Sequence, residues 1–259
     1  MLSVEGDELM EPIYEGMIKN DSQTTHRFTV HVLTLVHLPE ILFVQEQILM
    51  ELKDKESLQP LSSDEFKYIL SGEGLMLGAF VDDALIAFRA LLVPPIDEEQ
   101  HLGLDLGLKD KELNKVIYQE ISNVLPEYRG NQLQKTLATL IMQELSKEEH
   151  PYRYICCTVA PFNIPSLKDK FAQGMAIIGL KEKYEGLLRY IFVKDLENVD
   201  TPLWQEVAII EMNDITAQQS KLAEGWRGYH MEIRDDILWI QYGRKKCTDK
   251  MGLSNKSLK

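Results

Sequence analysis

A strand, a proline-marked turn and a helix follow one another without a break between Val124 and Gln134, and this succession constrains the fold more than any other feature. The β-branched run that ends at Val124 is typical of a buried strand. Pro126 marks a turn, and Arg129 and Gly130 lead into a segment whose apolar residues recur at helical spacing. The first turn of such a helix directs backbone N–H groups and the positive end of its dipole into the preceding turn. The sequence therefore predicts an anion site at this strand-to-helix connection.

The rest of the chain supplies a clear order of strands and helices. Apolar, β-branched runs predict strands over residues 28–35, 75–81, 85–92, 116–125, 154–159, 176–184 and 187–193. Helical spacing and start signals such as Pro39 predict helices over residues 39–52, 62–72, 131–148 and 164–173, with a helical turn over 109–113. The order is one strand, two helices and a hairpin, then two strand–helix units and a second hairpin.

This order and the loop together resemble the GNAT N-acetyltransferases, which bind acyl-CoA. In that family the strand ends in V-x-P-E-Y-R-G before the helix, as residues 124–130 do here. The family signature R/Q-x-x-G-x-G/A begins at Arg129, and Gln132 and Gln134 occupy its two later small positions. The resemblance implies the GNAT acyl-CoA N-acyltransferase fold over residues 26–197. That fold is of the α/β (α+β) class, with a central mixed, mostly antiparallel sheet flanked by helices.

The resemblance also implies a site for acetyl-CoA as co-substrate. The pyrophosphate would lie against the turn before the helix, where the cofactor-binding residues would be Arg129, Gly130, Asn131, Gln132, Leu133 and Gln134. Small residues let a backbone approach phosphates closely; Gln132 and Gln134 remove that freedom, although their amides could donate instead. The backbone of Val124 would lie beside the pantetheine arm, where the family splays two strands and leaves N–H groups for the thioester carbonyl.

A second block that is similar to the family follows the strand at 154–159. Asn163, Ser166 and the pair Gly174–Met175 stand where the family has N-x-x-A and, further on, Gly-Phe. The resemblance implies that Asn163 and Ser166 contact the cofactor arm. Asn163 is equally suited to cap the helix that follows, and the two roles are compatible.

Two residues are candidates for catalysis. Many GNAT enzymes place a tyrosine seven residues after this Asn to protonate the leaving thiolate, and Lys170 stands there in this chain. A lysine ammonium can donate a proton, whereas a lysine on an amphipathic helix is commonly solvent-facing. Glu120, on the strand before the loop, is the candidate general base, with an exposed strand-edge position as the alternative. Cys156 and Cys157 are expected to be small core residues, because no His is placed to activate either thiol.

The composition narrows the classes of function. The 259 residues carry a formal net charge of −13, which disfavours nucleic-acid binding because that binding neutralises phosphates with Lys and Arg. The charge suits a cationic amine substrate, although solubility alone explains an acidic surface. No apolar run is long enough to cross a membrane and the acidic start is wrong for a secretory leader, so we expect a cytoplasmic protein without membrane contact. The three cysteines have no metal-ligand spacing, and no metal is expected.

Both ends of the chain differ from the central domain. Residues 1–25 lack a clear period and are predicted to form an acidic, loosely attached N-terminal lead. Residues 198–243 predict a strand, a helix capped by Asp214 and a hairpin, an α/β C-terminal extension with too few apolar residues for a core of its own. The extension is expected to pack on the main sheet or to form a homodimer. Residues 244–259 are expected to be a basic, solvated tail.

The leading hypothesis is an acetyl-CoA-dependent N-acetyltransferase that transfers the acetyl group directly to a primary amine of a small molecule or peptide. No covalent enzyme intermediate is expected. The alternative is a catalytically weakened GNAT-fold module that binds CoA or another ligand in a regulatory or assembly role, which Gln132, Gln134 and Lys170 favour. A role of the extension in pairing subunits is compatible with either hypothesis.

Overall fold

The computed structural model describes residues 11–52, 58–147, 149–184, 186–198 and 204–244. The α-helices are α1 (Leu38–Glu51), α2 (Ser63–Leu70), α3 (Leu102–Asp105), α4 (Leu133–Leu145), α5 (Ile164–Ala172) and α6 (Ile215–Ala223). The strands are β1 (Tyr14–Lys19), β2 (Thr25–Val32), β3 (Gly74–Val81), β4 (Ala84–Leu92), β5 (Val116–Val124), β6 (Tyr154–Val159), β7 (Ala176–Lys183), β8 (Leu187–Asp195), β9 (Glu206–Glu211), β10 (Arg227–Arg234) and β11 (Ile237–Arg244).

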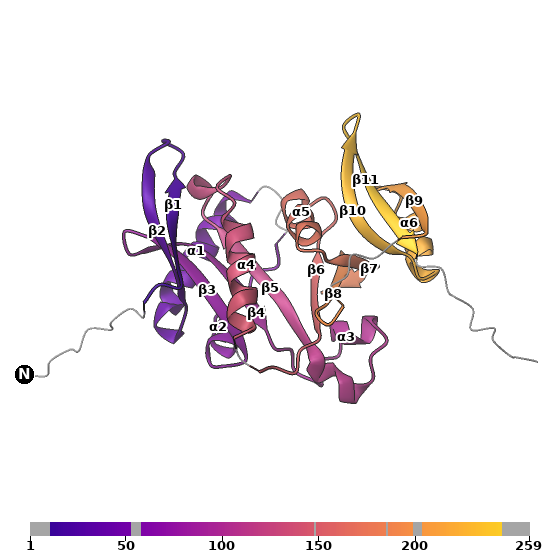
Figure 1. Ribbon diagram of the computed structural model, residues 1–259, viewed down its shortest axis with the longest axis horizontal. Coiled ribbons are helices and arrows are strands. Elements are labelled where there is room, and N and C mark those ends of the chain that lie inside the picture. The colour runs from indigo at the N-terminus through magenta and orange to yellow at the C-terminus, as the bar shows by residue number, and fades with distance from the viewer. Residues whose placement is uncertain (1–10, 53–57, 148, 185, 199–203, 245–259) are drawn as a thin grey trace, which may run out of the picture.

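All these strands belong to one 11-stranded sheet in the order β1-β2-β3-β4-β5-β6-β8-β7-β10-β11-β9 (Figure 1). The neighbouring strands run antiparallel, apart from β5 and β6, which are parallel. A parallel pair needs a crossover connection, and α4 supplies it between β5 and β6. The predicted mixed, mostly antiparallel sheet flanked by helices is confirmed.

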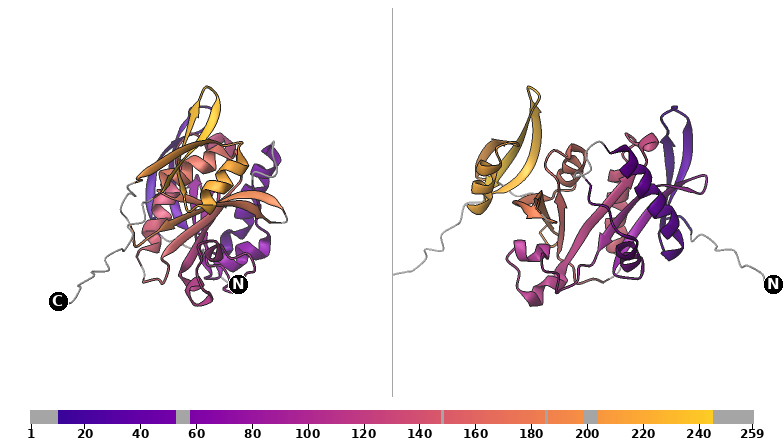
Figure 2. Two further views of the ribbon diagram at one scale, coloured as in Figure 1. Left: turned by 90° about the vertical axis from the view of Figure 1, so that its right-hand side faces the viewer. Right: turned by 180° about the vertical axis from the view of Figure 1, so that it is seen from behind.

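Helices cover both faces of the central strands, as Figures 1 and 2 show from opposite sides. On one face α4 packs on β3, β4 and β5, and its buried stripe includes Leu133, Leu137 and Ile141. On the other face α1 packs on β4 and β5, with Ile41 and Val44 fully buried. This one-sided burial is the result of apolar residues recurring every three to four positions. The helices therefore bury both faces of β4 and β5, as the apolar character of these strands requires.

The parallel pairing of β5 and β6 is short and then opens. It extends from Val116 opposite Tyr154 to Tyr118 opposite Cys156. Beyond these pairs β5 stays paired with β4, and β6 stays paired with β8 up to Val159. The two strands therefore diverge and leave a wedge between them, which we call the β5/β6 wedge. This is the strand splay that the family resemblance implied.

The prediction of a loosely attached lead is wrong for residues 14–19. They form β1, which pairs with β2 over its whole length, from Tyr14 opposite Val30 to Lys19 opposite Thr25. Of the side chains of β1 only Ile18 is buried, so the strand has little apolar alternation. Residues 1–10 of the predicted lead lie outside the described part of the chain.

The C-terminal extension continues the main sheet. β10 lies beside β7 with Gly228 opposite Ile177, and α6 packs on β7 and β10. The buried Gln218 of α6 accepts hydrogen bonds from the hydroxyls of Tyr190 and Tyr242, at 2.7 and 2.8 Å, and so joins the two parts. The expectation that the extension packs on the main sheet is confirmed. The sequence predicts the first hairpin strand over residues 231–234, and β10 begins four residues earlier, at Arg227. Of the predicted tail, residues 245–259 lie outside the described part.

Small differences separate the other predicted bounds from the observed ones. The helix predicted over 131–148 is α4, and the turn predicted over 109–113 is a 3-10 helix, Asp110–Lys115. The short α3 was not predicted. Within the described ranges no helix combines the length and the apolar character that crossing a bilayer demands.

Candidate functional site

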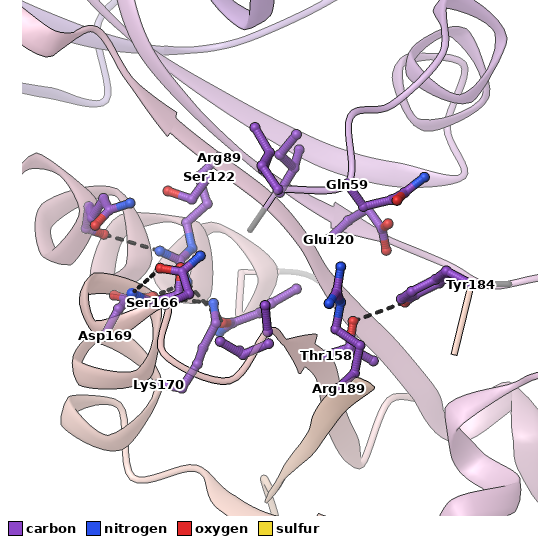
Figure 3. A pocket seen from close by; sticks show the side chains of 17 residues that line it. Gln59, Arg89, Glu120, Ser122, Thr158, Ser166, Asp169, Lys170, Tyr184 and Arg189 are labelled. Carbon is purple, nitrogen blue, oxygen red and sulfur yellow. Dashed lines mark hydrogen bonds and ion pairs between the residues drawn. The ribbon is translucent and has the colours of Figure 1, made fainter. Parts of the chain in front are cut away.

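A cavity of about 100 Å³ lies in the β5/β6 wedge (Figure 3). Its walls come from β4, β5, β6, β8 and α5, with Gln134 of α4 at one side. The cavity brings together these sequence-predicted site residues: Glu120, Gln134, Asn163, Ser166 and Lys170. Its lining does not include the other predicted residues, which are Val124, Arg129, Gly130, Asn131, Gln132 and Leu133.

The loop before α4 presents unpaired backbone N–H groups. Gly130 and Gln132 both adopt left-handed backbone conformations, with φ of +82° and +61°. Gln132 thus takes, without being glycine, a conformation that glycine adopts most easily. In the part of the chain that the structure describes, the amides of residues 130–134 make no hydrogen bond. These donors at the N-terminus of a 13-residue helix form a surface suited to an anion.

Two predicted residues of this loop have structural roles. Leu133 is buried in the core beneath α4, so only its backbone faces the loop. The Asn131 side chain donates to the carbonyl of Lys19 at 2.7 Å and accepts from the amide of Lys19 at 3.1 Å. It also donates to the carbonyl of Tyr128 at 3.0 Å. Asn131 therefore ties the loop to the end of β1.

Glu120 is the extra residue of a β-bulge. Leu91 of β4 lies opposite Gln119, and Ala90 lies opposite Ile121, so Glu120 has no partner on β4. Bulges of this kind turn a side chain away from the regular alternation of the strand. The Glu120 carboxylate is half-buried and makes no hydrogen bond or ion pair with a described residue. Burial, and then repulsion from Glu98 and Glu65, raises its pKa to about 7.

Polar groups from β6, β8 and the turn between β7 and β8 lie on the same side of the cavity as Glu120 (Figure 3). The Thr158 hydroxyl and the Tyr184 hydroxyl are 3.0 Å apart. Burial raises the pKa of Tyr184 to about 12, which keeps this phenol protonated. Arg189, buried on β8, lies on the same side of the cavity. This side therefore offers one ionisable carboxyl group among hydroxyls and a guanidinium.

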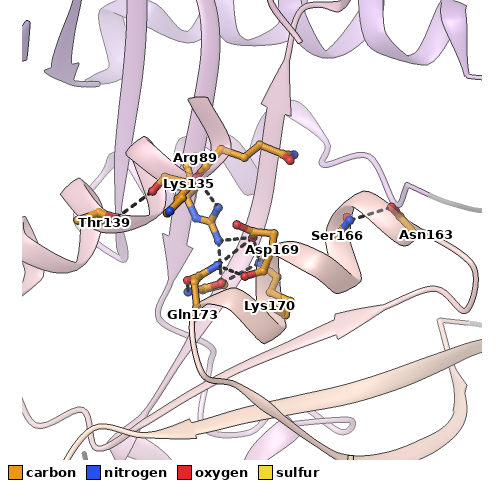
Figure 4. Close-up of polar contacts among 10 residues, drawn as sticks. Arg89, Lys135, Thr139, Asn163, Ser166, Asp169, Lys170 and Gln173 are labelled. Atoms are coloured by element: carbon orange, nitrogen blue, oxygen red, sulfur yellow. Dashed lines mark hydrogen bonds and ion pairs between the residues drawn. The ribbon is translucent and has the colours of Figure 1, made fainter. Parts of the chain in front are cut away.

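Lys170 is buried, and the solvent-facing alternative for it is wrong. Its ammonium donates to the side-chain oxygen of Gln119 at 2.7 Å and to Oδ2 of Asp169 at 3.2 Å (Figure 4). Burial and the nearby Arg89 guanidinium lower the pKa of Lys170. Burial works to raise the pKa of Asp169, but Lys170 and Arg89 together hold that pKa below its ordinary value.

Arg89 is a site residue that the sequence analysis missed. It lies on β4 and donates to Oδ2 of Asp169 at 3.0 Å and to the side-chain oxygen of Gln119 at 2.8 Å. It also donates to the backbone carbonyl of Gln134 at 3.2 Å, which links the cluster to the first turn of α4. The available signal was one arginine inside the otherwise apolar strand of residues 84–92, because a buried charge in a strand needs a special partner.

Asn163 caps α5, whereas its contact with the cofactor arm stays a prediction. Its side-chain oxygen accepts a hydrogen bond from the amide of Ser166 at 3.2 Å, which caps α5, and both residues line the cavity. Cys156 and Cys157 are buried in β6. Burial raises the pKa of Cys157 to about 11 despite the nearby Lys170, so both cysteines remain unreactive thiols.

No protein-family model matches the sequence, and no curated protein matches it either. Among solved structures, Arabidopsis thaliana NAA60 in complex with acetyl-CoA is similar, with a TM-score of 0.51 and 17% identity, covering 66% of this chain and 99% of that chain. The ribosomal-protein-S18-alanine N-acetyltransferase from Escherichia coli has a TM-score of 0.48 and 15% identity, covering 68% of this chain and 99% of its own. An acetyltransferase of the GNAT family from Streptococcus pneumoniae has a TM-score of 0.48 and 14% identity, and the match covers 65% of this chain and 99% of that chain.

At these identities the likeness concerns the fold. Together with the order of strands and the β5/β6 wedge, it shows that the chain has the fold of the GNAT acetyltransferases. The prediction of this fold is confirmed.

Proposed function

We propose that this protein transfers an acetyl group from acetyl-CoA directly to a primary amine. The observation that carries the proposal is the position of Glu120, a carboxyl group with a pKa of about 7 on a bulge in the β5/β6 wedge. A general base is most effective when its pKa lies near the working pH. The unpaired amides of residues 130–134 support binding of the CoA pyrophosphate at the start of α4.

The chemistry needs few groups of the protein. The amine nitrogen attacks the thioester carbonyl carbon, and Glu120 accepts the proton that the nitrogen loses. N–H groups at the wedge, where β5 and β6 no longer pair, are suitable donors for the oxyanion of the tetrahedral intermediate. Asn163 and Ser166 would contact the cofactor arm, the backbone of Val124 would lie beside it, and Lys170 would face the sulfur. Orientation of the two reactants supplies much of the rate.

The second candidate is a GNAT-fold module that binds CoA or another ligand and turns it over weakly. Gln132 favours this candidate, because its side chain is exposed at a position where a small residue would let phosphates approach. Gln134 lines the cavity and takes up space there. Lys170 stands in place of the tyrosine acid.

Titration calorimetry with acetyl-CoA, combined with an assay of thiol release in the presence of a panel of amines, separates the two candidates. For the enzyme we expect binding to the wild type and to Glu120→Gln, with turnover about 100-fold lower in the variant. Binding without turnover in either protein would support the module. An absence of binding heat at high protein concentration would reject the enzyme and a module that binds CoA, and would leave only a module for another ligand.

A further inference from the structure

Two buried cations share one carboxylate beside the cavity (Figure 4). The side chains of Arg89, Lys170 and Asp169 are 1%, 9% and 10% exposed. Oδ2 of Asp169 lies 3.0 Å from the Arg89 guanidinium and 3.2 Å from the Lys170 ammonium. The side-chain oxygen of Gln119 also accepts from both cations, but an amide carries no charge. Within the described ranges, the cluster therefore sets two basic side chains against a single carboxylate.

An unbalanced buried charge is costly, because the low dielectric of the interior does not replace water. The other ionisable groups nearby do not supply the missing negative charge. Cys157 stays a neutral thiol, because burial raises its pKa to about 11. Glu120 and Arg189 lie on the opposite side of the cavity (Figure 3). Among the described residues, no second carboxylate joins the cluster, and burial with the nearby Arg89 lowers the pKa of Lys170.

Two polar atoms next to the cluster find no partner among the described residues. Nε of Arg89 and the Ser122 hydroxyl are buried and make no hydrogen bond with them. Ser122 of β5 lies directly opposite Arg89 of β4 in the sheet, so the two side chains project from the same face. Both residues line the cavity, together with Lys170. A purely structural ion network would satisfy its donors, because buried polar groups in proteins are nearly always paired.

We propose that Arg89, Lys170 and Ser122 bind the sulfur of the departing CoA as a thiolate. This inference rests on the proposed acetyl transfer and assigns the fate of its leaving group. The amine nitrogen forms a bond to the acetyl carbon, the carbon–sulfur bond breaks, and its electron pair stays on sulfur. The proton from the nitrogen goes to Glu120. The products are the amide, the protonated Glu120 and the CoA thiolate, so no proton donor and no further reactant is needed.

This assignment explains why a lysine stands at position 170. A tyrosine there would act by giving up a proton, whereas the Lys170 ammonium is fixed by Gln119 and Asp169 and acts through its charge. A cation within a few ångströms of a thiol favours the ionised form of that thiol. Lys170 then takes part without changing its protonation state.

The test measures the pKa of the thiol of bound CoA. The probe is CoA itself, and the thiolate is followed by its ultraviolet absorbance during a pH titration. The complex with desulfo-CoA, which lacks the sulfur, provides the baseline. In the wild type we expect the pKa of the bound CoA thiol to lie at least about one unit below that of free CoA titrated under the same conditions.

Three variants locate the effect. Lys170→Met keeps the length of the side chain and removes its charge, so the pKa of the bound thiol should rise to the free value or above. Ser122→Ala should give a smaller rise in the same direction. Lys168→Met is the matched control, because Lys168 is exposed on the same helix and does not line the cavity. It removes the same charge and should leave the pKa of the bound thiol as in the wild type.

The outcomes distinguish this inference from the proposed function. If neither CoA nor desulfo-CoA binds, the proposed function fails. If both bind and the thiol of bound CoA ionises like the free thiol, the thiolate assignment is overturned while cofactor binding stands. An equal effect of Lys168→Met and Lys170→Met would also overturn it. The competing anion is a carboxylate on the acyl group. The thiolate assignment would be rejected in favour of this carboxylate if succinyl-CoA bound about tenfold tighter than acetyl-CoA and the pKa of the thiol of bound CoA were unshifted.

Discussion

At the scale of single residues, the position of Glu120 on a bulge predicts how kcat/KM depends on pH. Its pKa of about 7 arises from burial and from the charges of Glu98 and Glu65. Only the ionised carboxylate can accept a proton, so we expect kcat/KM of the wild type to fall as the pH drops below about 7. In Glu120→Gln this step near pH 7 should disappear, and any step that remains belongs to the amine substrate. The pH profile of kcat/KM for both proteins checks this.

The same carboxyl group should affect stability. Its pKa in the folded protein lies above the ordinary value of 4.5, so the folded state binds an extra proton between about pH 4.5 and 7. Stability therefore decreases as the pH rises through this window, because the unfolded state binds fewer protons there. Glu120→Gln should become progressively more stable than the wild type across the window and keep that advantage above pH 7. Urea unfolding at several pH values measures the difference, and a constant difference would contradict the assigned pKa.

A third prediction concerns Gly130. A glutamate there would place a negative charge at the unpaired amides of residues 130–134, so Gly130→Glu should weaken acetyl-CoA binding by at least about tenfold. Gly107→Glu is the control, because Gly107 also has a positive φ, is exposed and has open space around its Cα. Gly107→Glu adds the same charge and the same backbone strain as Gly130→Glu, but at a place away from the loop. Equal affinities in the two variants would remove this loop from the cofactor site.

Residue roles were only partly predictable. Glu120 and Lys170 could be selected because each has a defined place relative to the loop and to Asn163. The burial of Lys170 could not be predicted, because it depends on Gln119 and Asp169 lying within hydrogen-bonding distance. Arg89 lies far from the family motifs in sequence and joins the cluster only through the pairing of β4 with β5.

At the scale of elements, β1 and the loop before α4 support each other. Asn131 joins them through two hydrogen bonds to the backbone of Lys19. Asn131→Ala should lower the free energy of unfolding by about 1–2 kcal/mol and speed hydrogen exchange at the Lys19 amide. Asn114→Ala, at an exposed position, is the control for the loss of an asparagine side chain. Unchanged exchange at Lys19 would show that β1 does not depend on this contact.

Elements with a continuous apolar pattern were predicted close to their observed bounds, as β4, β5, β6, α4 and α5 show. Elements that depend on distant contacts were missed. β1 buries only Ile18. The four-residue α3 is held by a hydrogen bond from the amide of Leu102 to the hydroxyl of Tyr118, at 2.6 Å. The sequence around α3 does not indicate this contact, because the partner, Tyr118, lies in β5.

At the scale of the whole molecule, the extension depends on a close approach of two backbones. A Cβ at Gly228 would lie 3.0 Å from Cβ and Cδ1 of Ile177. Gly228→Val should therefore push β10 away from β7 and lower the free energy of unfolding by about 1–3 kcal/mol. His230→Val, at an exposed position of the same strand, should change stability much less. Equal stabilities of the two variants would contradict the observed docking of the extension.

The extension also has exposed apolar side chains, including Val207, Ile209 and Ile237. Pairing of two copies through residues 198–243 stays a prediction, and sedimentation velocity of the full chain at several concentrations measures it. A single monomeric species at all concentrations would reject it.

The short ladder between β5 and β6 has a consequence for the mechanics of the sheet. Strands β1 to β5 and the strands from β6 onward are joined edge to edge through the pairs from Val116–Tyr154 to Tyr118–Cys156. A ligand with amide groups in its backbone, lying in the wedge, would act as a short additional strand that bridges the two halves. Its binding energy would then count toward the cohesion of the sheet, and the melting temperature would rise with ligand concentration. The ligand would then stabilise the association of the two halves of the sheet, and the protein without ligand would be less stable.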